Sequence, residues 1–377
     1  MSDAGASHVR AALDRIVDRM LRATVLERIV IAIVSTTLAL GIGAGIVALS
    51  GYDAVEFVYS LVYGAVGELS NVAFTLRQST MLILAGVAVA VAFRAGVLNI
   101  GVQGQFVVGG FAATLAILFL TPLLPANTVA GVVLMVVAGG AAVAAGGAYG
   151  ALPGLMKAYA DANEVITTIM LNFIASGVVY FLLDAYLRPP GAAAPNTESF
   201  PDYVDLPGFA FGSPSFSVIG FGIALVTVAV VYVYMTQTGS GYDLVTSGYQ
   251  EPAAKYSGVD PNRMIVRTMT LSGMIAGLAG ALFAVMILGY YSDPNTFPTF
   301  GFDAIAVSLL AANNPLGVIP AGLLFGGLDA GGQYIGFTLD VPSELVDGVI
   351  GLIVLFVAAP ELFRAAGRYT GLGGDAG

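Results

Sequence analysis

The sequence predicts an all-α integral membrane protein, a polytopic bundle of about 8–10 transmembrane helices. Of its 377 residues, 57% are hydrophobic and only 10% are charged, whereas soluble domains carry roughly 25% charged residues. Apolar runs close to the roughly 20 residues that a helix needs to cross a bilayer recur along the chain. None of these runs alternates apolar and polar residues as the strands of a membrane β-barrel do.

Ten apolar runs are candidate membrane spans, and they define a membrane domain over residues 29–363. They are Ile29–Leu49, Thr75–Phe93, Gln105–Leu120, Thr128–Gly150, Val165–Leu183, Phe216–Met235, Met269–Gly289, Phe302–Ala312, Leu316–Tyr334 and Val346–Ala359. The runs that begin at Gln105 and Phe302 are short, so one or both are candidates for re-entrant segments.

Residues 1–28 precede the first span. Apolar residues from Val9 to Leu21 recur at helical spacing, opposite charged residues from Arg10 to Arg22. This pattern is typical of an amphipathic helix at a membrane surface. No small-residue cleavage site follows a short apolar core, so we do not expect a cleavable signal.

The charge distribution predicts that both termini are cytoplasmic, because basic residues concentrate in the short cytoplasmic loops of membrane proteins. With ten spans and the N-terminus inside, only Arg77 and Arg188 fall outside. The basic residues on the cytoplasmic side are then Arg10, Arg15, Arg19, Arg22, Arg28, Arg94, Lys157, Lys255, Arg263, Arg267, Arg364 and Arg368. Residues 364–377 become a cytoplasmic tail, and residues 187–214 become an external loop.

The loop at residues 239–267 is the only long polar segment on the predicted cytoplasmic side. Within it, Gln250 to Tyr256 are expected to form one or two helical turns, because Pro252 is tolerated in a first turn. Ser257–Gly258 and Asp260–Pro261 are expected to end them. The small residues Ala253, Ala254 and Gly258 permit close approach to a partner, while Glu251 and Lys255 are spaced to pair or to reach across an interface.

The segment from Phe93 to Gln105 predicts a broken helix, since it contains Gly96, Gly101 and Gly104 and each glycine costs about 1 kcal/mol in a helix relative to alanine. Non-helical backbone near a bilayer is tolerated where it is buried in protein or lines a cavity. Asn99, Gln103 and Gln105 are therefore candidates for contacting a neutral polar solute. The alternative is an ordinary cytoplasmic turn after Arg94.

A second polar group lies at four-residue spacing on one span: Glu164, Thr168, Asn172 and Ser176. This spacing keeps all four on one side of a helix, so they are candidates to line a pathway; the alternative is hydrogen bonding between helices without solute contact. A third group comprises Asp303, Asn313, Asn314 and Asp329. Structural hydrogen bonding or helix-end capping is favoured for Asp303, whereas Asp329 is equally a pathway candidate.

Several chemistries are excluded. The chain has no cysteine and a single histidine, His8, in the N-terminal tail, so thiol chemistry and histidine-based metal or triad sites have no basis. Neither Lys157 nor Lys255 ends a phosphate-binding loop of the P-loop type. We therefore expect no enzyme, no bound metal, no cofactor on this chain and no nucleic-acid partner.

Four ordered motifs resemble the permease subunits of ABC importers. They are Ala95–Gln105, Asn163–Asn172, Leu271–Gly280, and Gly301–Val307 with Asn314–Gly317. The resemblance runs from about Thr75 to Phe363 and is to the branch shared by branched-chain amino acid, ribose and nucleoside systems, most of all to nucleoside permeases. Gln103 stands where a glutamate is common in these permeases, and Gln250–Glu251 precede Pro252 where a shorter Asn-Pro lead is usual.

The resemblance implies a plasma-membrane permease that imports a solute by alternating access. It implies a second permease subunit, expected to make a heterodimer, separate ABC ATPase subunits that bind ATP and Mg²⁺, and an external solute-binding lipoprotein. The loop at residues 239–267 would carry the coupling helix, with Glu251, Ala253, Ala254, Lys255 and Gly258 at the ATPase. Sugars and branched-chain amino acids are alternative solutes, and an ion-coupled symporter or a passive channel are alternative functions.

Overall fold

The computed structural model describes residues 25–207, 216–249 and 251–370. Its ordered elements in this part of the chain are helices, without a named strand. The first of them are α2 (Val25–Leu49), α3 (Ala54–Val66), α4 (Leu69–Arg94), α5 (Val102–Leu120), α6 (Thr128–Ala160) and α7 (Glu164–Leu182). They are followed by α8 (Val218–Gln237), α9 (Gly239–Tyr249), α10 (Glu251–Tyr256), α11 (Pro261–Leu282), α12 (Phe300–Leu310), α13 (Val318–Thr338) and α14 (Ser343–Thr370). Short π-helical turns extend α7 and α11 to Leu187 and Leu288, and a 3₁₀ turn extends α5 to Leu123.

Each of the ten predicted spans coincides with a helix, which confirms an all-α polytopic membrane protein. Among the described residues, six helices are long and apolar enough to cross a membrane: α4, α6, α8, and α5, α7 and α11 with their extensions. The extended α5 covers 22 residues, so it needs no re-entrant path. The 11 residues of α12 span about 16 Å and are too short to cross. The total of 8–10 spans and the cytoplasmic termini stay predictions.

Three features differ from expectation. Helix α4 begins at Leu69 and not at Thr75, so it includes the polar residues Ser70 and Asn71 before the apolar run. Arg77 lies within this helix, which is a candidate membrane span over Leu69–Arg94. Helix α3 was not predicted, and neither was α9, whose glycines suggested a loop. The predicted amphipathic helix at residues 1–28 lies almost wholly outside the described residues. Residues 371–377 of the predicted tail also lie outside them.

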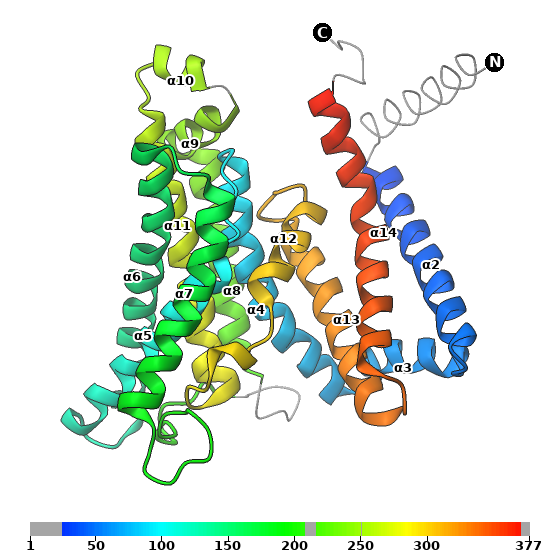
Figure 1. The fold of residues 1–377 in the computed structure, drawn as a ribbon, viewed down its shortest axis with the longest axis horizontal. Helices are drawn as coiled ribbons and strands as arrows, with labels where there is room; N and C mark the ends of the chain where they lie inside the picture. Colours follow the sequence, from blue (N-terminus) through cyan, green and yellow to red (C-terminus); the bar gives the residue numbers. More distant parts are fainter. Residues whose placement is uncertain (1–24, 208–215, 250, 371–377) are drawn as a thin grey trace. The chain divides into compact units, whose positions relative to one another are not determined.

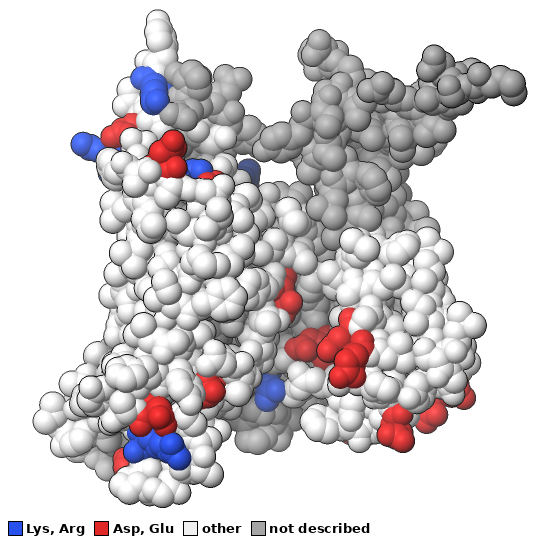
Figure 2. All heavy atoms as spheres, in the orientation of Figure 1, with Lys and Arg blue, Asp and Glu red and all other residues white. Residues whose placement is uncertain are grey.

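The chain divides into two compact units. The smaller one contains residues up to Gly64 and from Gly331 onward, and within it α14 packs against α2. The larger unit spans Ala65–Ala330, and its long helices run side by side, with α9 and α10 together at one end (Figure 1). On the face that Figure 2 shows, its charged side chains gather mainly at the two ends of the bundle, with a long uncharged band between them.

Helix α11 is central to the larger unit and packs against α4, α5 and α6. Glycines allow these helices to touch through their backbones. A Cβ atom at Gly146 of α6 would lie 2.7 Å from the Cα atom of Gly277, and one at Gly110 of α5 would lie 2.8 Å from the carbonyl oxygen of Gly280. Glycine at these positions therefore permits close packing of the helices.

The loop at residues 187–214 is described as far as Pro207. Its amide of Thr197 donates to the carbonyl of Tyr291 at 2.8 Å, and the Tyr291 amide donates back to the Thr197 hydroxyl at 3.0 Å. The phenol of Tyr291 donates to the carbonyl of Val107 at 2.7 Å. Complete burial raises the pKa of Tyr291 well above its ordinary value, so this phenol stays a hydrogen-bond donor and fixes the loop to α5.

Substitution of Gly146 tests the backbone packing. Gly146→Val would place side-chain atoms in the α6–α11 contact, and overpacking of this kind costs about 1–3 kcal/mol. We expect a clearly lower midpoint of thermal unfolding in detergent. Gly140→Val on the same helix is the matched control, because nothing lies within 4 Å of its Cβ position. Equal midpoints for the two variants would contradict the packing model.

Candidate functional site

Residues 95–101 interrupt the helix between α4 and α5. Gly96 has a φ of 70°, and the amides of Gly96 and Val97 donate to the carbonyls of Phe93 and Ala92 at 3.1 and 3.0 Å. This is the Schellman arrangement, in which a glycine in the left-handed conformation ends a helix. The predicted break in the helix is confirmed, and its backbone is well ordered by hydrogen bonds.

Asn99 is fully buried within this segment. Its Nδ2 donates to Oε1 of Gln105 at 3.0 Å and to the Ser272 hydroxyl at 2.8 Å. Nε2 of Gln105 donates back to Oδ1 of Asn99 at 3.2 Å, and the amide of Gly101 donates to the same oxygen at 3.0 Å. Ser272 donates to the carbonyl of Ala88 at 2.6 Å. This Asn99 network, made of Asn99, Gln105 and Ser272, joins the non-helical segment to α4, α5 and α11.

Asn172 holds the same segment from α7. Its Oδ1 accepts a hydrogen bond from the amide of Gly104 at 2.8 Å, and its Nδ2 donates to the carbonyl of Ile100 at 2.9 Å. Thr168 is buried one turn earlier, and Ser176 is half-buried one turn later. The opposite face of α7 exposes Ile166, Met170, Phe173, Ile174 and Val178. The polar stripe therefore turns into the protein, while the apolar face turns outward as expected in a bilayer.

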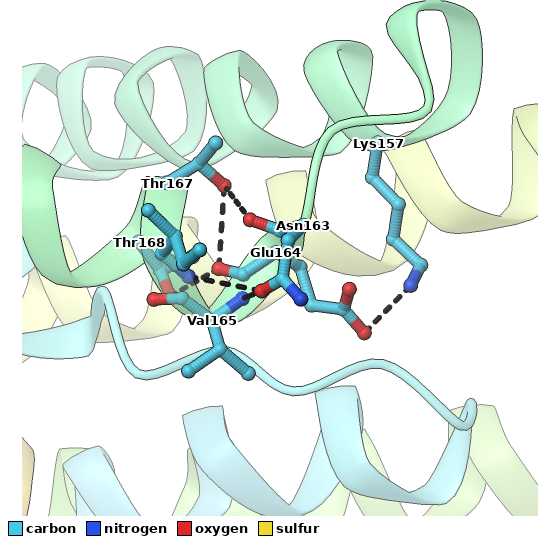
Figure 3. A network of polar contacts seen from close by, with 7 residues as sticks. Lys157, Asn163, Glu164, Val165, Thr167 and Thr168 are labelled. Atoms are coloured by element: carbon cyan, nitrogen blue, oxygen red, sulfur yellow. Dashed lines mark hydrogen bonds and ion pairs between the residues drawn. The ribbon is translucent and has the colours of Figure 1, made fainter.

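The first turn of α7 is built by polar contacts (Figure 3). Oδ1 of Asn163 accepts from the amides of Val165 and Ile166 at 3.0 and 3.1 Å, which caps the helix. Glu164 pairs with Lys157 at the end of α6, with 2.6 Å between Oε1 and Nζ. Glu164 thus stabilises the α6–α7 corner and lies far along α7 from Asn172.

Gln103 joins α5 to the start of α12. Its Oε1 accepts from the amide of Gly301 at 2.7 Å, and its Nε2 donates to the carbonyl of Pro298 at 3.1 Å. An ionised glutamate at this position would lack the donor for Pro298, because a carboxylate only accepts. The amide therefore matches both of its backbone partners.

Asp329 belongs to a separate cluster on α4 and α13. It accepts a hydrogen bond from Nε2 of Gln78 and interacts electrostatically with Arg77 and with Asp303. Arg77 is next to Gln78 on α4 and supplies a positive charge near Asp329. Asp303 accepts from the Thr299 hydroxyl at 3.1 Å, in agreement with the structural hydrogen bonding favoured for it.

The polar loop forms a helical pair, α9 and α10. Helical turns were predicted for residues 250–256, and α10 confirms them over the part that the structure describes. Ala254 is fully buried within the chain, whereas Lys255 and Gly258 are exposed and Tyr256 is 97% exposed. Ala254 therefore packs α10 onto its own chain, contrary to the expectation that it faces a partner. The side chains of Glu251 and Ala253 lie outside those described.

The structure thus brings together five of the eight predicted pathway residues around the helix break: Asn99, Gln103, Gln105, Thr168 and Asn172. Glu164 and Asp329 lie elsewhere, and Ser176 lies one turn beyond Asn172 on α7. A role in solute contact stays a prediction for all eight. An apolar cavity of about 500 Å³ between α6, α8 and α11 is lined by none of them. Sequence reasoning missed Ser272, although it lies within a motif that carried the resemblance.

Comparison with known proteins gives a family and several relatives. The model of the family described as branched-chain amino acid transport system / permease component matches residues 71–358. The guanosine ABC transporter permease protein NupP of Bacillus subtilis (strain 168) is 34% identical over 90% of this chain and 95% of its own. The glucose ABC transporter permease protein TsgB13 of Haloferax volcanii is 31% identical over 77% of this chain and 76% of its own. A second guanosine permease protein of Bacillus subtilis, NupQ, is 25% identical over 71% and 84%.

Substitution of Asn172 tests its role in holding the break. Asn172→Leu removes the partners of the Gly104 amide and the Ile100 carbonyl, and each buried group left unpaired costs about 1–3 kcal/mol. We expect a lower midpoint of thermal unfolding in detergent. The control is Thr167→Val on the same helix, because that hydroxyl donates to carbonyls of its own helix turn. A midpoint for Asn172→Leu equal to that of the control would contradict the assignment.

Proposed function

The chain belongs to the family of branched-chain amino acid transport system permease components, and we propose that it forms the membrane pathway through which an ABC importer moves nucleosides into the cell. As a permease subunit it is a multi-pass protein of the plasma membrane. The proposal adds the solute, the partners and the residues that connect this chain to its energy source.

The exposed α9–α10 pair is the observation that carries the coupling role. It connects the membrane-spanning helices α8 and α11 and lies at one end of the larger unit (Figure 1). Tyr256 at the end of α10 is 97% exposed, and aromatic residues are enriched where proteins bind each other. We assign this surface, made of Lys255, Tyr256 and Gly258, as the contact for an ATPase subunit that binds ATP and Mg²⁺.

A nucleoside is the solute that the relatives favour. NupP, which is named for guanosine, matches this chain over most of both lengths. Amide side chains such as Asn99, Gln103 and Gln105 suit a neutral solute with several donors and acceptors. A sugar is the second candidate, because the relative from Haloferax volcanii is named for glucose and the same amides suit hydroxyl groups.

A second permease subunit and an external solute-binding lipoprotein complete the proposed importer. Two guanosine permease proteins of one bacterium, NupP and NupQ, both resemble this chain, which supports a heterodimer of two different permeases. The external loop that Tyr291 fixes to α5 provides an ordered surface for the lipoprotein.

Two other functions, an ion-coupled symporter and a passive channel, are less well supported by the structure. A symporter would need an uncompensated carboxylate in the membrane, but Asp329 is bonded to Gln78 and lies in the field of Arg77. This compensation favours a structural role for Asp329 over cation binding. A passive channel would not need the α9–α10 pair.

Transport by the reconstituted importer tests the proposal. Liposomes containing both permeases and both ATPases, with the lipoprotein outside, should accumulate radiolabelled guanosine only when ATP and Mg²⁺ are enclosed. Excess unlabelled nucleoside should compete, whereas glucose and leucine should not. Uptake that survives without ATP would indicate a channel, and uptake lost on collapse of the ion gradient with ATP present would indicate a symporter. Competition by glucose alone would reassign the solute.

A single exposed side chain tests the ATPase contact. Tyr256→Ala should weaken co-purification of the ATPase and lower uptake at least about tenfold, since a central aromatic anchor is worth about 2 kcal/mol or more. Insertion into the membrane should be normal. Tyr186→Ala is the matched control, because this tyrosine is also exposed but follows α7 at the far end of the bundle. Normal ATPase binding by Tyr256→Ala would place the contact elsewhere.

A further inference from the structure

Helix α9 lies directly against the non-helical segment that contains Asn99. The contact is between two backbones, at Gly248 near the end of α9 and at Ala95–Gly96 just after α4. A Cβ atom at Gly248 would lie 2.5 Å from the carbonyl oxygen of Ala95 and 2.6 Å from the amide nitrogen of Gly96. A Cβ atom at Gly96 would lie 2.7 Å from the carbonyl oxygen of Gly248. Glycine at both positions is what permits this approach.

Neither backbone segment in this contact can move easily to make room for a side chain. Gly96 is held in the left-handed conformation by the Schellman bonds to Phe93 and Ala92, and an alanine there would be strained as well as crowded. On the other side, α9 is attached to the end of α8, where the amide of Gly241 donates to the Thr238 hydroxyl at 3.1 Å. A movement of α9 therefore displaces residues 95–97 as a unit, because backbone atoms, unlike a long side chain, have no alternative rotamer.

Asn99 follows two residues after Val97, so a displacement of this turn reaches the Asn99 network at once. Three of the hydrogen bonds in that network, at 2.8 to 3.2 Å, depend on the position of the Asn99 side chain. Hydrogen bonds weaken steeply with distance and angle. Small displacements of the turn are therefore enough to break the amide pair between Asn99 and Gln105.

The α9–α10 pair is also connected to the Asn99 network through the end of α10. After α10, the left-handed Gly258 and the cap of Asp260, which accepts from the amide of Asn262 at 3.0 Å, begin helix α11. Ser272, the third member of the network, lies on α11. The two ends of the α9–α10 pair thus converge on Asn99, one through Gly248 and Gly96 and the other along α11.

We propose that Gly248 is a positioning residue for transport, and that its backbone contact with Gly96 transmits movement of the α9–α10 pair to the Asn99 network. The inference rests on the proposed function, since it requires an ATPase that moves the pair. It assigns Gly248 no contact with solute or nucleotide. Its role is to keep ATP hydrolysis and the rearrangement of residues 95–101 in step.

Gly248→Ala in the complete reconstituted importer tests the inference. A merely structural defect would lower ATP hydrolysis and uptake together, whereas lost transmission uncouples them. We expect normal assembly and ATP hydrolysis, with at least a tenfold rise in ATP hydrolysed per nucleoside imported. Gly239→Ala on the same helix is the matched control, because nothing lies within 4 Å of its Cβ position. Its ratio should equal that of the unaltered chain.

A ratio in Gly248→Ala equal to that of the control would overturn the inference. ATP-dependent import by the unaltered chain tests the proposed function separately. If Gly248→Ala does not assemble, hydrogen–deuterium exchange of the unaltered complex decides instead. Adding ATP should change amide exchange in residues 239–249 and in residues 95–101 together. A change confined to residues 239–249 would overturn the inference, and a change in neither segment would remove the coupling role of the α9–α10 pair as well.

Discussion

The structure depends above all on one constraint. Between α4 and α5 the backbone leaves the helical conformation within the membrane domain, and its amide and carbonyl groups there need other hydrogen-bond partners. Residues 95–101 cannot satisfy all their backbone groups as a helix would, and buried backbone groups need partners from the protein itself. Asn99 bonds to the amide of Gly101, and Asn172 bonds to the carbonyl of Ile100 and the amide of Gly104. The surrounding helices are therefore arranged by the needs of this short segment.

Close helix packing follows from the same requirement. Amide side chains are short, so α5, α7 and α11 can bond to the segment only if they approach it and each other closely. Glycine supplies that proximity where α11 crosses α5 and α6, as at Gly146 and Gly280. In a bilayer such packing replaces the hydrophobic driving force that soluble proteins use. The hydrogen bonds to the non-helical segment and the close helix packing at glycines therefore depend on each other.

Much of the fold could be predicted because hydrophobic length and glycine placement are local properties. The apolar helices, the break at Gly96 and the helical turns before Tyr256 all depend on neighbours in sequence. The partners of the polar residues could not be predicted, since they depend on which helices meet. The pairing of Asn99 with Ser272 joins residues 173 positions apart. Helix α9 was missed because the glycines that suggested a loop are used for tertiary contacts, as Gly248 shows.

The occupied state of the Asn99 network also constrains how a solute can be handled. The Nδ2 group of Asn99 donates to two partners and its Oδ1 accepts from two, which uses the ordinary capacity of an amide. A solute that bonds to Asn99 must therefore displace Gln105, Ser272 or the amide of Gly101, and the displaced group needs a new partner. Movement of the turn at Gly96 would break the same hydrogen bonds. By linkage, solute binding at Asn99 and movement of the α9–α10 pair would favour each other to an equal extent, so a single small network is sufficient to connect the two events.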